Sequence, residues 1–231
     1  MSQNPLVSLI ILTYNQENYI EEAIEGALSQ TYSPLEIVFS DDNSPDSTFE
    51  VISKRLENYN GPHKIILNKN VPNLGLVQHV NKLVSEVCTG DYIAFSAGDD
   101  ISMPARIEES IKFINENTEV VALSTSLIVI DENSDISANQ PKEIKNNVIY
   151  DLNYFLSDSF KHINGPSRIV SKQVFNFFPP LNSNCPTEDS TYLFRSFLIG
   201  KVGLLANKGV KYRVHGNNMS SAAGLKKMNV N

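Results

Sequence analysis

Four apolar runs alternate with three helical patterns along the first hundred residues of the chain. We expect strands at residues 7–12, 35–39, 63–67 and 91–97, and helices between them at residues 20–28, 47–56 and 76–87. The first run, VSLIIL, contains a single polar residue, which is typical of a strand buried on both faces. Short connections in this strict alternation predict a mainly parallel central sheet flanked by helices.

The second half of the chain is less regular. We expect a helix at 103–114, a long strand at 120–130, a polar loop at 131–147, a helix near 152–160, a strand near 168–170, a helix after Glu188-Asp189 and a strand near 209–214. A length of 231 residues fits one large α/β domain, or such a domain with a small subdomain. Residues 223–231 contain few apolar side chains, and we expect a flexible tail there.

Composition disfavours several classes of protein. The formal net charge of −7 argues against a sequence-independent nucleic-acid binder, which needs a basic surface. The two cysteines, Cys88 and Cys185, form no CxxC pattern, so we expect reduced thiols and no zinc site. The first apolar run is too short for a signal peptide or a membrane span, which predicts a cytoplasmic location.

Two of the expected strands end in adjacent acidic residues. Asp99 and Asp100 follow the fourth strand, and Asp41 and Asp42 follow the second. Two ionised neighbours repel each other unless a cation or a polar ligand lies between them, and open α/β sheets bind ligands at this edge. The pair Asp99-Asp100 is therefore a candidate site for a hard metal ion, and the alternative is a solvated turn.

The first strand ends in Thr13, Tyr14 and Asn15, with no glycine-rich phosphate loop of the GxGxxG or GxxxxGK[ST] type. A hydroxyl, an aromatic ring and an amide suit a planar base and a ribose. Asp42 could accept the imide N–H of a uracil or thymine ring packed near Tyr14. In the alternative interpretation, Tyr14 is a half-buried core aromatic and the Asp41-Asp42 pair only caps the next helix.

Several ordered motifs resemble family 2 glycosyltransferases of the GT-A fold. The resemblance rests on TYN after the first strand, SQTY after the first helix, DDNSPDST after the second strand, Asn73-x-Gly75, Asn81, GDYI, GDDISMPARIE, Glu188-Asp189 with Arg195 and Gly200, and YRVHGNN near the end. These motifs spread over nearly the whole chain. The resemblance implies one domain over residues 1–222, with a nucleotide-sugar-binding half to about residue 102 and a smaller, mixed acceptor-binding half after it.

The resemblance also implies roles for individual residues. The nucleotide site would comprise Thr13, Tyr14, Asn15, Asp42, Asn73, Gly75, Asn81 and Asp99, with Asp42 on the pyrimidine imide. Asp99 and Asp100 stand at the family's DxD-type motif, which binds Mn²⁺ or Mg²⁺ on the diphosphate. Many members carry a further acid before this pair, where this chain has Ala97, so either aspartate could ligate the metal directly, with Asp100 slightly favoured.

The catalytic pair implied by the resemblance is Glu188-Asp189, with Asp189 as the base that deprotonates the acceptor hydroxyl. Without the resemblance, two acids at the start of a helix would be read as favourable charges near its N-terminus. His215 is a candidate ligand of the metal or the diphosphate, and Arg213 either assists the diphosphate or pairs with an acid. Gly165 lies where the family has a loop on the acceptor side.

The resulting expectation is a metal-dependent, inverting glycosyltransferase. It would take a nucleotide-diphosphate sugar, most simply a UDP-sugar, and a saccharide or lipid-linked acceptor of cell-surface polysaccharide synthesis. The protein would be cytoplasmic and peripheral to the inner membrane through its acceptor or a partner, since the acidic balance gives no attraction to anionic lipid. The sugar, the linkage and the oligomeric state stay open. The alternatives are a non-catalytic nucleotide-sugar-binding module and a sugar-nucleotide pyrophosphorylase.

Overall fold

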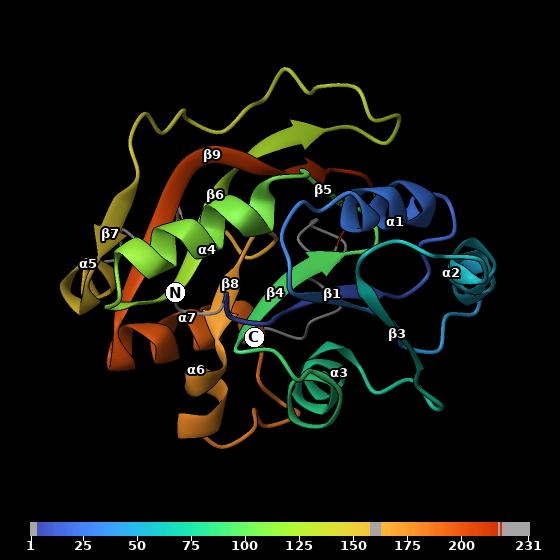
Figure 1. The fold of residues 1–231 in the computed structure, drawn as a ribbon, viewed down its shortest axis with the longest axis horizontal. Helices are drawn as coiled ribbons and strands as arrows, with labels where there is room; N and C mark the ends of the chain where they lie inside the picture. Colours follow the sequence, from blue (N-terminus) through green and yellow to red (C-terminus); the bar gives the residue numbers. More distant parts are fainter. Residues whose placement is uncertain (1–3, 158–162, 217, 219–231) are drawn as a thin grey trace.

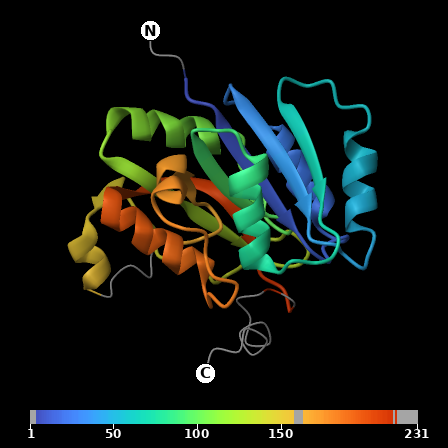
Figure 2. The ribbon, with the colours of Figure 1, turned by 90° about the horizontal axis from the view of Figure 1, so that it is seen from below.

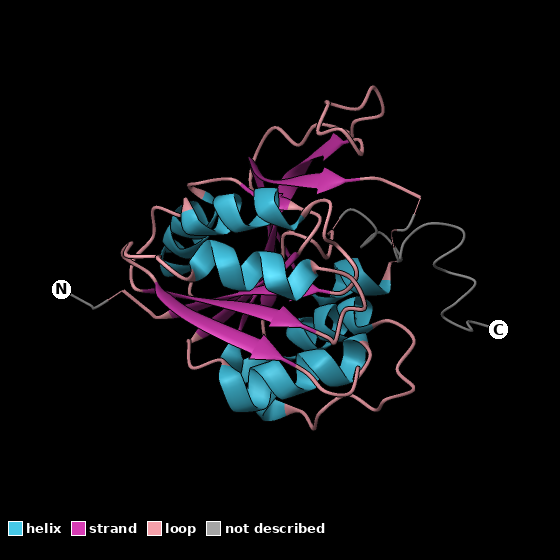
Figure 3. Ribbon diagram, turned by 90° about the vertical axis from the view of Figure 1, so that its right-hand side faces the viewer, coloured by secondary structure: helices cyan, strands magenta, loops and turns pink. Residues whose placement is uncertain are grey.

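The computed structural model describes residues 4–157, 163–216 and 218, and it contains one mixed sheet with helices on both faces (Figures 1 and 3). The strands are β1 Val7–Thr13, β2 Leu35–Asp41, β3 Lys64–Lys69, β4 Tyr92–Ala97, β5 Ile101–Ser102, β6 Val120–Ile130, β7 Val148–Tyr150, β8 Ile169–Ser171 and β9 Lys201–Arg213. The helices are α1 Ile20–Leu28, α2 Thr48–Leu56, α3 Leu76–Lys82 with the π-helical turn η1 Leu83–Val87, α4 Arg106–Glu116, α5 Leu152–Leu156, α6 Lys172–Phe177 and α7 Glu188–Ile199.

The sheet order is β3-β2-β1-β4-β8-β6-β9-β5, with β7 paired to β9. Strands β3, β2, β1 and β4 are mutually parallel, as the alternation of strands and helices predicts. Strand β8 runs antiparallel to both β4 and β6, whereas β9 is parallel to β6. The parallel part therefore has all its carboxyl ends at one edge, and the second half of the chain extends the same sheet.

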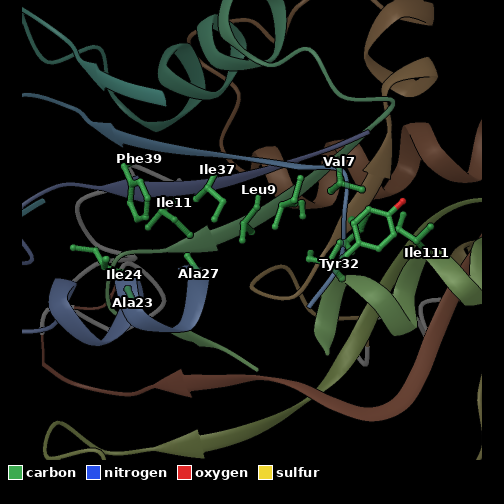
Figure 4. Packing of buried hydrophobic residues seen from close by; sticks show 14 of the residues in the cluster. Val7, Leu9, Ile11, Ala23, Ile24, Ala27, Tyr32, Ile37, Phe39 and Ile111 are labelled. Atoms are coloured by element: carbon green, nitrogen blue, oxygen red, sulfur yellow. The ribbon is translucent and has the colours of Figure 1, made fainter. Parts of the chain in front are cut away.

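Side chains of β1 alternate between two cores, which explains the unbroken apolar run. Leu9 and Ile11 pack with α1, α2 and α4 on one face (Figure 4). Ile10 packs on the other face, against α3 and η1 and against Tyr192 of α7. Figure 2 shows α3, α6 and α7 on this second face. Because both faces of β1 are buried, packing holds the carboxyl end of β1 in place relative to the neighbouring strands.

The expected elements are confirmed with three differences. Strand β2 continues to Asp41, so Asp41 belongs to the strand, and β9 begins at Lys201 rather than near 209, because its first half pairs with β6. The short strands β5 and β7 and helix α6 carry too few residues for a clear periodic pattern, and the sequence did not predict them. The last residues of the helix expected near 152–160, and the tail expected at 223–231, lie outside the described residues.

Candidate active site

The loops after β1 and β2 are joined by hydrogen bonds at the carboxyl edge of the sheet. The amide of Asn15, which has a positive φ of 58°, donates to Ser44 Oγ at 2.9 Å, and the amide of Gln16 donates to Thr48 Oγ1 at 2.8 Å. Thr13 is buried, and its hydroxyl donates to the Ser40 carbonyl at 3.1 Å. Tyr14 is 53% exposed at this edge, so the alternative of a half-buried core aromatic is wrong.

The neighbouring acids Asp41 and Asp42 differ in their surroundings. The Asp41 carboxylate is fully buried and accepts hydrogen bonds from the Ser44 amide at 2.9 Å, from the Ser44 hydroxyl, and from Thr13 Oγ1 at 3.3 Å. Asp41 thereby closes the turn that follows β2. Its role in the described structure is to hold the two loops together.

Asp42, which is 4% exposed, organises the loop between β3 and α3. Its Oδ1 accepts from Asn70 Nδ2 at 2.8 Å and from the Leu74 amide at 2.9 Å, and its Oδ2 accepts from the Gly75 amide at 2.9 Å. Asn73 Nδ2 donates to the Asp42 carbonyl at 2.6 Å, and Gly75 adopts a φ of 74°. The structure therefore brings Asp42, Asn73 and Gly75 together.

His79 lies beneath this acidic pair, although no sequence pattern singles it out. Its Nε2 is 2.5 Å from Ser40 Oγ, and the side chain is buried. Burial lowers the pKa of His79, although Asp42 and Asp41 act in the opposite direction. The His79 imidazole near Asp41 and Asp42 is therefore neutral at neutral pH. From sequence, His79 is indistinguishable from an ordinary residue on the inner face of a helix.

Asn81, which was also predicted for the nucleotide site, contacts a different part of the chain from Asp42, Asn73 and Gly75. Its side-chain amide donates to the Leu181 carbonyl at 2.8 Å, and its Oδ1 accepts from the Leu181 amide at 3.0 Å and from the Tyr192 hydroxyl at 3.3 Å. Asn81 therefore ties α3 to the segment that precedes α7. With its amide engaged in this way, we leave Asn81 out of the candidate nucleotide pocket.

The turn containing Asp99 and Asp100 packs against the loop after β1. A Cβ on Gly98 would lie 2.5 Å from Gln16 Oε1 and 2.7 Å from Thr13 Cγ2. Glycine at position 98 thus lets the Asp99-Asp100 turn approach the segment Thr13-Tyr14-Asn15. Asp99 and Asp100 are 7% and 1% exposed, so this turn is not solvated, contrary to the alternative interpretation.

Burial and the neighbouring Asp99 raise the pKa of Asp100 well above its usual range, against the opposing effect of Arg213 and Arg106. Asp100 Oδ1 accepts the Arg213 amide at 2.9 Å, and Asp99 Oδ2 lies 2.9 Å from His215 Nε2. Asn218 holds the segment of His215 in place, since its side chain accepts the His215 amide and donates to the Arg213 carbonyl.

Arg213 is a buried connector and is not available for a diphosphate. Its Nε donates to the Asp99 carbonyl at 2.9 Å, its Nη1 to Ser134 Oγ at 2.9 Å, and its Nη2 to Glu22 Oε2 at 3.2 Å. The guanidinium also lies 4.8 Å from the centroid of the Tyr19 ring. Of the two roles considered for Arg213 from the sequence, pairing with an acid is the one that the structure shows.

The side chains around Asp99 and Asp100 offer the kinds of ligand atom that a divalent cation binds. Within the described residues, no three His, Cys, Asp or Glu side chains are already arranged around a metal position. However, Asp99, Asp100 and His215 supply carboxylate oxygens and an imidazole nitrogen, and a cation between the two carboxylates would offset both the burial and the mutual repulsion that raise the pKa of Asp100. These three residues could therefore hold Mn²⁺ or Mg²⁺.

Helix α7 begins with the predicted catalytic pair. The Asp189 side chain is 57% exposed, and its Oδ1 lies 3.5 Å from Arg168 Nη1. Burial, and secondarily the charge of Asp189, raise the pKa of Glu188 to about 7. Glu188 is thus close to half ionised near neutral pH. The exposed Asp189 carboxylate is accessible to a substrate hydroxyl.

Arg168 is a site residue that the sequence did not reveal. It is buried, and its Nη1 donates to the Asp189 carbonyl at 2.6 Å, while its Nη2 donates to the carbonyls of Ile163 and Asn164 at 3.3 and 3.1 Å. Its own carbonyl accepts the amide of Phe95 in β4 at 2.9 Å. Arg168 therefore connects the start of α7 to the strand that leads to Asp99.

The chain resembles known proteins over most of its length. The model of "Glycosyl transferase family 2" matches residues 8–178. An uncharacterised glycosyltransferase of Haemophilus influenzae is 31% identical over 230 residues, covering 96% of this chain and 69% of that protein. The Escherichia coli enzyme named UDP-Glc:alpha-D-GlcNAc-diphosphoundecaprenol beta-1,3-glucosyltransferase WfaP is 36% identical over 141 residues, covering 60% of this chain and 53% of that enzyme.

Among solved structures, Staphylococcus aureus TarS residues 1–349 in complex with UDP-GlcNAc matches with a TM-score of 0.74 at 20% identity, covering 94% of this chain and 61% of that chain. This likeness shows a shared fold. The chain spans between 45% and 69% of the length of four of the curated relatives that it matches, and a smaller share of several others. None of the helices in the described ranges is both long enough and apolar enough to cross a bilayer.

Proposed function

Because the chain belongs to glycosyl transferase family 2, we propose that it transfers a sugar from a UDP-sugar to a hydroxyl group of a saccharide or lipid-linked oligosaccharide, with inversion at the anomeric carbon. The name of the related WfaP enzyme describes a UDP-sugar donor and a lipid-linked acceptor, and TarS was solved with UDP-GlcNAc. These neighbours support a UDP-sugar as the donor, and the name of WfaP supports a lipid-linked acceptor. The cellular location that follows is the cytoplasmic face of the inner membrane.

The donor nucleotide would bind where the loops after β1, β2 and β3 meet. Thr13, Tyr14 and Asn15 would contact the nucleotide from one side, and Asp42 with the Asn73-Gly75 segment from the other. Asp42 Oδ2 accepts a hydrogen bond from the Gly75 amide, and a carboxylate oxygen can accept a second one, from a donor such as a pyrimidine imide. The first half of the chain, to about residue 102, would thus be the donor half.

The sugar diphosphate would extend from this pocket to Asp99, Asp100 and His215. A divalent cation held there would neutralise charge that develops on the leaving diphosphate. Other residues of the chain would position the acceptor. Asp189, exposed at the start of α7, would take the proton of the attacking hydroxyl, and the Arg168 guanidinium lies 3.5 Å from its carboxylate.

One structural observation carries this proposal: the donor side and the acceptor side are anchored on the same strand. The amide of Phe95 in β4 donates to the Arg168 carbonyl, the Arg168 side chain holds Asp189, and the turn that follows β4 carries Asp99 four residues after Phe95. Fixed placement of two reactants is a large part of catalysis, because it replaces a bimolecular encounter with a preset geometry. A shared strand provides such a placement.

Two other functions would use the same fold. A non-catalytic module would bind the nucleotide sugar without transferring it, and a pyrophosphorylase would form a nucleotide sugar from UTP and a sugar phosphate. The pyrophosphorylase is disfavoured because TYNQENY after β1 lacks a glycine-rich basic loop. Asp189 separates the transferase from the binding module, because only the transferase needs a base.

The test compares the wild type with Asp189→Asn, using release of UDP from a panel of UDP-sugars and calorimetric UDP binding as two readouts. We expect the substitution to lower transfer about 10²-fold or more, the usual contribution of a general base, and to leave UDP affinity unchanged. Loss of both sugar transfer and UDP binding in Asp189→Asn would show that Asp189 has another role. Unchanged transfer would exclude it as the base, and binding without turnover in the wild type would favour the module.

A further inference from the structure

A pocket of about 450 Å³ lies between the 131–147 loop and the β6–β9 ladder, away from the acidic pairs. In Figure 1 this loop arches from the end of β6 back to β7 alongside β9. Ser126 of β6, Tyr150 of β7, Lys208 of β9 and Lys142 of the loop are among its lining residues. This volume falls within the usual range of small-molecule sites.

A bulge in the sheet forms the floor of this pocket. The β6–β9 pairing passes from Thr125–Leu205 directly to Ser126–Lys208, so Ala206 and Asn207 have no partner on β6. β7 provides no ladder partner for these two residues either, since its pairing with β9 ends at Leu204. Such bulges redirect side chains and are frequent beside active sites. Here the bulge presents Lys208 to the pocket.

The pocket wall is directly connected to the candidate catalytic base. Asn164 lines the pocket, and its side chain is fixed by hydrogen bonds to the Thr125 carbonyl at 2.8 Å and from Ser167 Oγ at 2.7 Å. The next residue, Gly165, lies against the Asp189 carboxylate so closely that a Cβ on it would overlap Asp189 Oδ2. The pocket lining is therefore adjacent in sequence to the residue that contacts the Asp189 carboxylate.

The lining contains positive charge on a chain whose net charge is −7. Lys142 and Lys208 line the pocket together with one acid, Glu143. Among the residues that the structure describes, neither lysine forms an ion pair. Unpaired ammonium groups at a pocket are suited to bind an anion.

We propose that this pocket binds the acceptor saccharide, and that Lys142 and Lys208 bind an anionic group on it, either a phosphate or a carboxylate. The inference rests on the proposed function, because it takes Asp189 as the base. Tyr150, whose ring stacks on Tyr154 with centroids 3.7 Å apart, supplies an aromatic surface for the apolar face of a sugar. The accepting hydroxyl then points past Gly165 toward Asp189.

The test measures binding of three probe classes by saturation-transfer NMR in the presence of UDP and Mg²⁺. The probes are sugar 1-phosphates, uronic acids and the corresponding neutral sugars, which separates a phosphate from a carboxylate. The variants are the double substitution Lys142→Gln/Lys208→Gln and the control Lys145→Gln, an exposed lysine of the same loop outside the lining. UDP affinity is measured in parallel for every variant.

We expect at least one anionic probe to bind about tenfold or more tightly than its neutral counterpart, with loss of this preference in the double variant only, because charge-assisted hydrogen bonds are strong. Equal binding of neutral and anionic probes, no binding of any probe, or a preference that survives the double substitution would overturn the proposal. UDP binding distinguishes the two levels: if UDP binds and the probes fail, only this inference falls, whereas failure of UDP itself removes the proposed function.

Discussion

The backbone of Gly165 lies directly against the carboxylate of Asp189, with no room for a side chain between them. Asp189 is exposed, so burial does not hold its carboxylate in position. Its position follows instead from the Gly165 contact on one side and Arg168 on the other. The requirement for glycine at position 165 is therefore steric, and it concerns the group proposed to act as the base.

Gly165→Ala tests this contact. A methyl group would push the Asp189 carboxylate aside, and a displacement of about 1 Å can lower the rate of transfer about 10²-fold. We expect a fall in kcat of that order with unchanged UDP affinity. Gly216→Ala, where a Cβ would meet no heavy atom of the described residues within 4 Å, is the control for replacing a glycine. Equal activity of Gly165→Ala and wild type would show that the contact does not position the base.

Arg168→Met tests the connector between β4 and α7. The substitution leaves the carbonyls of Asp189, Ile163 and Asn164 without their guanidinium donor, and we expect a loss of about 2–4 kcal/mol in the free energy of unfolding. Urea denaturation measures it. Arg195→Met is the matched control, because Arg195 is only half-buried and donates to one carbonyl, that of Pro179, so a loss below about 1 kcal/mol is expected. Similar losses in both variants would contradict this account.

Local pattern was sufficient to predict the parallel half of the fold. The apolar runs of β1, β2 and β4 are buried on both faces, so burial leaves a direct trace in the sequence. The α/β fold expected for a family 2 glycosyltransferase is confirmed. By contrast, β5 and β7 have only two and three residues, and their pairing with β9 depends on contacts across more than fifty residues, which no local pattern records.

The candidate site was predictable only where a motif marks it. Asp42, Asn73 and Gly75 belong to motifs, and the structure brings them together. Asn81 belongs to a motif as well, yet its amide bonds to Leu181, one hundred residues away. Arg168 and His79 were missed because a buried polar residue inside a strand or helix pattern gives no sign of its distant partners.

Asp42→Asn separates the structural role of this carboxylate from its proposed role in base recognition. The amide would place an N–H group against the Gly75 N–H, so we expect a loss of about 1–3 kcal/mol in the free energy of unfolding. We also expect UDP affinity to fall about tenfold or more, since a buried acceptor for the imide is lost. Asp41→Asn, which disturbs the adjacent turn, should lower stability but leave UDP affinity nearly unchanged in the folded protein. Equal losses of UDP affinity in the two variants would argue against Asp42 as the residue that contacts the uracil ring.

Glu188→Gln should show a stability difference that depends on pH. The pKa of Glu188 is raised to about 7 in the folded protein, so between about pH 4.5 and 7 the folded state binds more protons than the unfolded state and wild-type stability falls as pH rises. Gln carries no charge to bury. Allowing for partial exposure, we expect the variant to be more stable than wild type by about 1–2 kcal/mol at pH 8, and by much less at pH 5.

Chemical denaturation at the two pH values measures this difference. Glu109→Gln, on the exposed face of α4, serves as the control for replacing a glutamate by glutamine. A constant difference between Glu188→Gln and wild type across pH would mean that Glu188 titrates as it does in the unfolded chain.

The central claim is that Asp42 and the Asp99-Asp100 pair belong to one donor site, and a calorimetric titration of UDP with and without Mn²⁺ tests it most directly. We expect UDP to bind, to bind about tenfold or more tightly with Mn²⁺, and to lose this metal dependence in Asp99→Ala, because a carboxylate ligand of the cation is removed. No UDP binding by a folded sample, or binding that neither Mn²⁺ nor Asp99→Ala alters, would contradict the claim.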